Sequence, residues 1–197
     1  MKTYRNFTMD VVLYPHPSLK MTANPVLRID NILRQQIENM FQLMYATNGV
    51  GLAGPQVELP YRVFVMNYTG DPEKKDKEMV FINPIILRRG GKLVSGEEGC
   101  LSFPGIFAKV VRPERVTVRA FNIKGEMFTA TFEGLAARCV QHENDHLDGY
   151  CFIDRLDENE RRRIQKKLDK QIERYNAGET INKGVEDPSS EQPEQAE

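Results

Sequence analysis

Histidine, cysteine, tryptophan and long hydrophobic runs are scarce or missing. The 197 residues include three histidines, three cysteines and no tryptophan. No apolar run approaches the roughly 20 residues needed to cross a bilayer, and the N-terminal residues lack the apolar segment of a secretory signal. Three cysteines cannot all pair, which argues against a disulfide framework. We therefore expect a cytoplasmic protein with no membrane partner.

Charge of either sign is not in large excess. The formal net charge is -1, so the charge of the whole molecule does not indicate a nucleic-acid or membrane partner. Charged residues make up 28% of the chain and hydrophobic residues 40%, as is usual for a globular protein. The length suits one domain, which we predict to cover residues 1–176.

The final segment has little that could form a core. Residues 177–197 contain six acidic residues, one lysine and almost nothing apolar. Such a composition buries too little apolar surface to offset the entropy of ordering, and we predict a disordered acidic tail.

Hydrophobic periodicity predicts an α+β fold. Helical spacing occurs at residues 26–47, 134–147 and 158–176, and Asp30 is a candidate cap for the first helix. Strands are predicted at residues 61–68, 79–89, 114–123 and 126–134, with a hairpin turn between the last two. Since strands and helices are segregated, we expect mostly antiparallel strands packed around a central helix, with a further helix at the C-terminal end. The central helix would bury Leu135, Cys139 and Val140.

Two of the three histidines lie four residues apart within that central helix. His142, Glu143 and His146 form an H-E-x-x-H motif. Residues four apart share one face of a helix, so both imidazoles can reach one metal ion. The ion would lower the pKa of a bound water, and Glu143 could accept the proton and pass it to a leaving amine. The pattern favours a metal site over a solvated helix face, and this helix is the expected metal-binding element.

A third ligand is needed, because catalytic zinc-type sites usually have three protein ligands and a water. No histidine lies downstream of His146, whereas acidic residues such as Asp154 and Asp157 do. His16, between two prolines, is typical of a surface loop. Cys100 lies between two glycines on a predicted loop, where the backbone can approach a site closely, and its thiolate would bind a cation strongly. Spacing alone leaves this choice open.

Three segments together resemble the peptide deformylase family. They are "GVGLAGPQ" (49–56), "EGCLS" (98–102) and "QHENDHLDG" (141–149), in the family's order. The resemblance implies removal of the N-terminal formyl group from formyl-methionyl chains made by the ribosome. It also implies that Cys100, His142 and His146 bind the metal and that Glu143 is the acid and base. The family typically uses Fe(II), with Zn(II) or Ni(II) as substitutes, whereas ligand softness alone would favour zinc.

The resemblance also assigns residues to the substrate. The Gln56 amide and the Leu101 backbone N–H would stabilise the oxyanion, although Gln56 could simply cap its loop. Gly51 would hydrogen-bond to an extended peptide, and Val50, Leu135 and Cys139 would line the methionine pocket. Asp145 would orient a ligand or pair with Arg112, unless it is an exposed helix residue.

Gly54 is a small departure, because the family usually has alanine there. We expect it to loosen the loop by roughly 0.5–1 kcal/mol of backbone entropy.

Two alternatives to a deformylase remain at this point. A general H-E-x-x-H metallopeptidase would use the same helix without a preference for a formyl group. A non-catalytic protein would close the metal site with a fourth protein ligand.

The last predicted helix raises a separate question about a partner. Its basic cluster could contact the ribosome, but a solvated face with balancing acidic neighbours is the favoured interpretation. The cluster comprises Arg161, Arg162, Arg163, Lys166 and Lys167.

Overall fold

The computed structural model describes residues 9–182, and its centre is an antiparallel sheet of five strands. The strand order is β2-β3-β4-β5-β6, so each strand pairs with its neighbour in sequence. The strands are β2 (Gly51–Ala53), β3 (Val63–Met66), β4 (Met79–Gly99), β5 (Phe107–Phe121) and β6 (Met127–Glu133). The predicted α+β class is confirmed.

Strand β4 is longer than its predicted range of 79–89. The strand continues through two adjacent glycines, Gly90 and Gly91, with a register shift between Gly90 and Leu93. Pairing with β5 then extends to Gly99, directly before Cys100. The register shift lets β4 bend without losing its pairing with β5. The long hairpin therefore places Cys100 close to His142 and His146.

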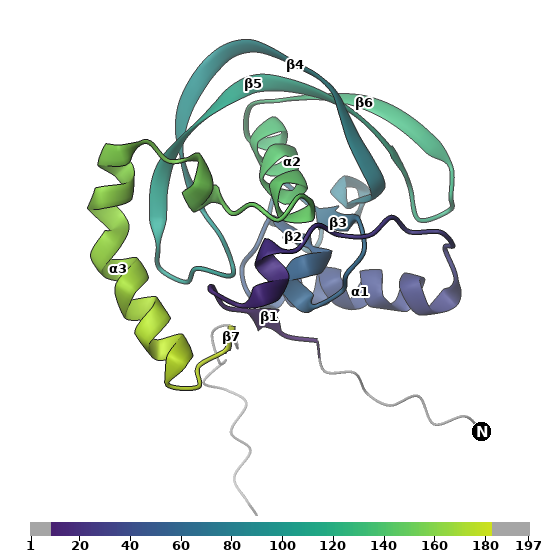
Figure 1. Ribbon diagram of the computed structural model, residues 1–197. Coiled ribbons are helices and arrows are strands. Elements are labelled where there is room, and N and C mark those ends of the chain that lie inside the picture. The colour runs from purple at the N-terminus through teal and green to yellow at the C-terminus, as the bar shows by residue number, and fades with distance from the viewer. Residues whose placement is uncertain (1–8, 183–197) are drawn as a thin grey trace, which may run out of the picture.

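Helix α2 (Gly134–Leu147) has the predicted boundaries and lies beneath the arch that β4, β5 and β6 form (Figure 1). Val140 and Cys139 are buried as expected. The prediction for Leu135 is wrong, because 58% of this residue is exposed. Leu135 lies in the first turn of the helix, before the arch encloses it, whereas every residue from Cys139 to Leu147 is buried.

Helix α1 (Asn31–Ala46) lies on the other side of the short strands (Figure 1). It begins at Asn31, directly after Asp30, which accepts a hydrogen bond from the Leu33 N–H at 3.0 Å. That bond confirms the predicted cap, which satisfies one of the unpaired donors of the first turn. The buried side of α1 carries Leu33, Ile37, Met40 and Met44.

Helix α3 (Glu158–Asn176) also has the predicted boundaries, and it runs along β5 (Figure 1). Ile164 and Leu168 are buried against a core that includes Phe152. After α3 the chain turns back, and β7 (Ile181–Asn182) pairs with β1 (Val11–Val12).

The predicted disorder of residues 177–197 is therefore wrong over residues 177–182, because backbone pairing orders them without an apolar core. Residues 183–197 lie outside the described residues. Among residues 9–182, no helix is both long enough and apolar enough to cross a membrane.

Gly54 packs closely against the backbone of a neighbouring loop segment, so it does not loosen its own loop as the sequence suggested. A Cβ atom there would lie 2.7 Å from the Leu59 carbonyl oxygen and 2.8 Å from that of Tyr61. Neither carbonyl can rotate away like a side chain, so glycine allows a close approach between two loop segments. This packing role was not visible in the sequence, which indicated only a loss of backbone entropy.

The substitution Gly54→Ala should therefore destabilise the fold by about 1–3 kcal/mol, the usual cost of overpacking. Urea unfolding at equilibrium measures this difference. Gly90→Ala is the matched control, because a Cβ at Gly90 would meet nothing within 4 Å. Equal stability of the two variants would contradict the packing role of Gly54.

Candidate metal centre

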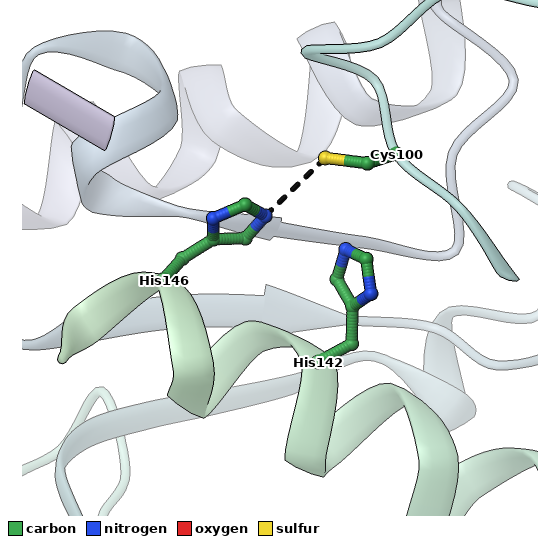
Figure 2. A group of neighbouring side chains, drawn as sticks. All are labelled: Cys100, His142 and His146. Atoms are coloured by element: carbon green, nitrogen blue, oxygen red, sulfur yellow. Dashed lines mark hydrogen bonds between the residues drawn. The ribbon is translucent and has the colours of Figure 1, made fainter. Parts of the chain in front are cut away.

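Helix α2 presents two imidazoles on one face. His142 and His146 are one turn apart, and their ring centroids are 5.0 Å apart. Both residues are buried beneath the arch. Figure 2 shows both rings directed toward the space beside Cys100. The predicted helical geometry therefore places two nitrogen donors close enough to bind one metal ion.

Cys100 supplies a sulfur atom from the loop that follows β4. Its Sγ lies 3.3 Å from His146 Nε2 (Figure 2). The donor atoms of Cys100, His142 and His146 all lie within 4.8 Å of one another. In the part of the chain that the structure describes, this is the group of acidic, cysteine and histidine side chains spaced to hold a metal ion.

The other candidate ligands lie in structural positions. Asp154 accepts hydrogen bonds from Lys20 and from the Cys151 N–H, each at 2.7 Å. Asp157 caps α3. His16 accepts a bond from the Ser18 N–H in a short turn. Each has a local role that explains its presence without a metal.

A buried carboxylate supports the histidine side of the cluster. Glu98 Oε2 lies 3.0 Å from His142 Nδ1. Arg112 donates two bonds to the same carboxylate, at 2.6 and 2.9 Å, and Arg138 donates a third at 2.7 Å. Burial raises the pKa of Glu98, but the bonds from Arg112 and His142 outweigh burial and hold it well below its usual range. Glu98 therefore remains an anion that fixes the imidazole.

Sequence reasoning missed Glu98. The residue belongs to the "EGCLS" segment, and its position two residues before a candidate thiolate was the available signal. In the sequence alone, a glutamate beside glycines is typical of a solvated loop. Only the fold shows that 6% of Glu98 is exposed.

Asp145 continues the buried ionic network on the far side of Arg112. Its carboxylate accepts a bond from Arg112 at 2.8 Å, which confirms that predicted pair. Arg155 adds two further bonds, at 2.7 and 3.1 Å. Asp145 is 6% exposed, so the alternative of an exposed helix residue is excluded. Arg112 thus joins two carboxylates, one of which contacts His142.

Glu143 faces the pocket beside the cluster. Burial raises the pKa of its carboxyl to about 7. A Cβ atom at Gly51 would lie 2.4 Å from Glu143 Oε1 and 2.8 Å from Cys139 Sγ. Glycine at residue 51 therefore lets the β2 backbone approach this carboxylate closely, whereas a Cβ there would require the side chains of Glu143 and Cys139 to shift.

The predicted site residues line one pocket of about 570 Å³, a size typical of small-ligand sites. Two of its apolar lining residues have exposed side chains, Val50 at 36% and Leu135 at 58%. The candidate residues that line it are Val50, Gly51, Gln56, Cys100, Leu101, Leu135, Cys139, His142 and Glu143. His146 lies deeper, with no exposed surface.

Gln56 has two roles in this geometry. Its Oε1 accepts a bond from the Ala53 N–H at 2.9 Å, so it does cap its loop. Its Nε2 lies 3.3 Å from both Cys100 Sγ and Ser102 Oγ. The capping bond orients the amide, and the NH₂ group is thereby directed toward the cluster.

The chain is similar to known deformylases over most of its length. A family model described as polypeptide deformylase matches residues 8–162. The peptide deformylase of Neisseria meningitidis serogroup B (strain MC58) is 46% identical over 162 residues, which is 82% of this chain and 95% of the relative. That of Alkalilimnicola ehrlichii is 42% identical over 172 residues, 86% of this chain and 95% of the relative.

Solved structures give the same result. A plant peptide deformylase superposes with a TM-score of 0.85 at 37% identity, over 92% of this chain and 99% of the other. A peptide deformylase of Legionella pneumophila gives a TM-score of 0.77 at 40% identity, over 86% and 98%.

The role of Glu98 can be tested by Glu98→Ala. His142 would lose the carboxylate at Nδ1, and loss of such a partner typically lowers metal affinity about 10–100-fold. Competition with a chelator measures the affinity, with circular dichroism as a check on folding. The neighbouring exposed Glu97→Ala serves as the control. Unchanged affinity in a folded Glu98→Ala protein would show that the carboxylate does not support the ligand.

Proposed function

The chain belongs to the polypeptide deformylase family, and we propose that Cys100, His142 and His146 hold its catalytic metal while Glu143 transfers protons. The protein is a metal-dependent hydrolase of the formyl group, and the general metallopeptidase is not favoured. The observation that carries the residue assignment is the convergence of one sulfur and two imidazoles beside the buried carboxylate of Glu143.

The donor set suits a divalent transition metal. One thiolate and two neutral imidazoles match the ligands that zinc and iron accept in proteins, and the three donor atoms are close enough to share one ion. When bound, such an ion would supply Lewis-acid polarisation of the formyl carbonyl and a water of lowered pKa. We propose Fe(II) as the native ion from the family resemblance, with Zn(II) or Ni(II) able to replace it.

Glu143 is placed to handle the protons of the reaction. It follows a ligand on the same helix, and its carboxylate faces the pocket at Gly51. Hydrolysis requires a base to accept a proton from water and an acid to protonate the departing α-amine. One carboxylate that performs both steps leaves the enzyme in its starting protonation state.

Two donors stabilise the developing negative charge on the formyl oxygen. We propose the Gln56 side-chain amide and the Leu101 backbone N–H. Gln56 is held by its bond to Ala53, so its NH₂ needs little reorganisation during the reaction. Preorganised donors of this kind are typically worth about 3–4 kcal/mol each in the transition state.

The substrate would bind as an extended chain along β2. This strand is at the edge of the sheet, where a peptide can add through backbone hydrogen bonds, and Gly51 is the proposed contact. The methionine side chain would occupy the apolar lining formed by Val50, Leu135 and Cys139. The exposure of Val50 and Leu135 supports this, because their apolar surface is available for contact.

Newly synthesised formyl-methionyl chains are the proposed substrates, and the cytoplasm is the proposed location because synthesis occurs there. For α3, ion pairs favour the solvated-face interpretation over ribosome binding. Arg162 pairs with Glu158, and Arg163 donates to Glu160 at 2.7 Å.

Replacing Glu143 should separate catalysis from metal binding. Glu143→Ala is expected to retain one metal ion per chain, because the three ligands are unchanged. Its kcat for formyl-Met-Ala should fall by at least about 10²–10⁴-fold, the usual contribution of general acid and base catalysis. Elemental analysis and a formate-release assay measure the two quantities. Turnover near that of the parent would refute the role of Glu143.

Substrate choice distinguishes this function from a general peptidase. The protein should release formate from formyl-Met-Ala and leave a casein substrate intact under the same conditions. Acetyl-Met-Ala is the matched control, because it differs only in the methyl group on the reacting carbonyl. Cleavage of casein at a rate comparable with deformylation would support the peptidase alternative.

A further inference from the structure

The segment after α3 returns to the candidate metal centre. Strand β7 pairs with β1, and the Leu13 N–H donates to the Thr180 carbonyl at 2.8 Å. Asn182 thereby reaches the rim of the pocket and is one of its lining residues. The family-model match ends at residue 162, so that match assigns no role to this segment.

Asn182 contacts the loop that carries Cys100. Its Nδ2 donates to the Leu101 carbonyl at 2.9 Å. Gln171, which is buried in α3, donates to the next carbonyl, that of Ser102, at 2.9 Å. The C-terminal part of the chain therefore holds two successive carbonyls of this loop.

The geometry of the loop explains why these contacts matter. Residues 100–103 form a turn in which the Phe103 N–H donates to the Cys100 carbonyl at 2.8 Å. That bond fixes the peptide unit between Cys100 and Leu101, which carries the Leu101 N–H. The next peptide unit carries the Leu101 carbonyl, which Asn182 holds. The turn therefore restrains the peptide unit before Leu101, and Asn182 restrains the peptide unit after it. Both backbone dihedral angles of Leu101 are restrained as a result.

We propose that Asn182 is a positioning residue that orients Leu101, so that the Leu101 N–H is directed at the formyl oxygen in the transition state. The inference rests on the proposed function, in which that N–H stabilises the oxyanion. It adds that a residue beyond the family-model match completes the active site. The Asn182 side chain acts through the backbone of Leu101 and not on the metal ligands directly.

A purely structural role would have different consequences. If Asn182 only fastened the C-terminal segment, its loss would lower stability and leave the chemistry of folded protein intact. If it only bound substrate, its loss would raise KM. A positioning residue for a transition-state donor lowers kcat instead, because that donor is needed mainly when charge develops on the oxygen.

The test compares Asn182→Ala and Asn182→Asp with the parent. The Asp side chain keeps the size of Asn but cannot donate to a carbonyl at neutral pH. Glu179→Ala is the matched control, because Glu179 lies in the same segment but is exposed and pairs with Arg174 on the surface. For each protein, kcat and KM for formyl-Met-Ala, metal content and thermal midpoint are measured. Amide hydrogen exchange of residues 100–103 is followed in the same samples.

Both Asn182 variants should lose about 3–10-fold in kcat, the factor that corresponds to one net hydrogen bond. KM should stay within about twofold, because the interaction belongs to the transition state. Metal content and thermal midpoint should match the Glu179→Ala control, and exchange in the turn should accelerate.

Several results would overturn the inference. They are unchanged kcat in both variants, a raised KM at constant kcat, loss of metal, and loss of stability without a change in kcat. If the parent itself released no formate, the proposed function would fail. The exchange measurement would still test the restraint, and unchanged exchange in the turn would refute it.

Discussion

The candidate metal centre depends on one buried carboxylate, Glu98, that belongs to three parts of the fold at once. It lies one residue before the end of β4, accepts hydrogen bonds from Arg112 of β5 and contacts both His142 and Arg138 of α2. A carboxylate with so little exposed surface is tolerated only when its charge is paired and its oxygens are hydrogen-bonded. These pairs fix the strand, and therefore the Cys100 loop, relative to the helix that carries both imidazoles.

The positions of the buried α2 side chains and of strand β2 follow from this arrangement of β4 and α2. Because α2 is enclosed by the arch of β4, β5 and β6, His142 and Glu143 are buried against the pocket, and His146 is buried behind them. The close approach of Gly51 brings the edge strand β2 to the same carboxylate. In the proposed function, a chain that adds to β2 would therefore present its first residue to the candidate metal ligands and to Glu143 together.

The sequence predicted the features that depend on residues close together in the chain. The limits of α2 and α3 agreed because helical spacing marks both helices and Asp157 caps the start of α3. The four-residue spacing of His142 and His146 fixed their shared face. Cys100 needed the family resemblance, because its partners are brought near only by tertiary structure. Glu98, the full length of β4 and the order at 177–182 were missed for the same reason. Leu135 was predicted to be buried because spacing identifies a face but not how far the sheet covers it.

The most direct test of the account is an X-ray absorption spectrum of the protein purified without oxygen. The first coordination shell should contain one sulfur and two imidazole nitrogens per metal ion, since Cys100, His142 and His146 are the donors that the fold brings together. A shell with no sulfur, or with fewer than two imidazoles, would contradict the central claim that this loop and this helix share one ion.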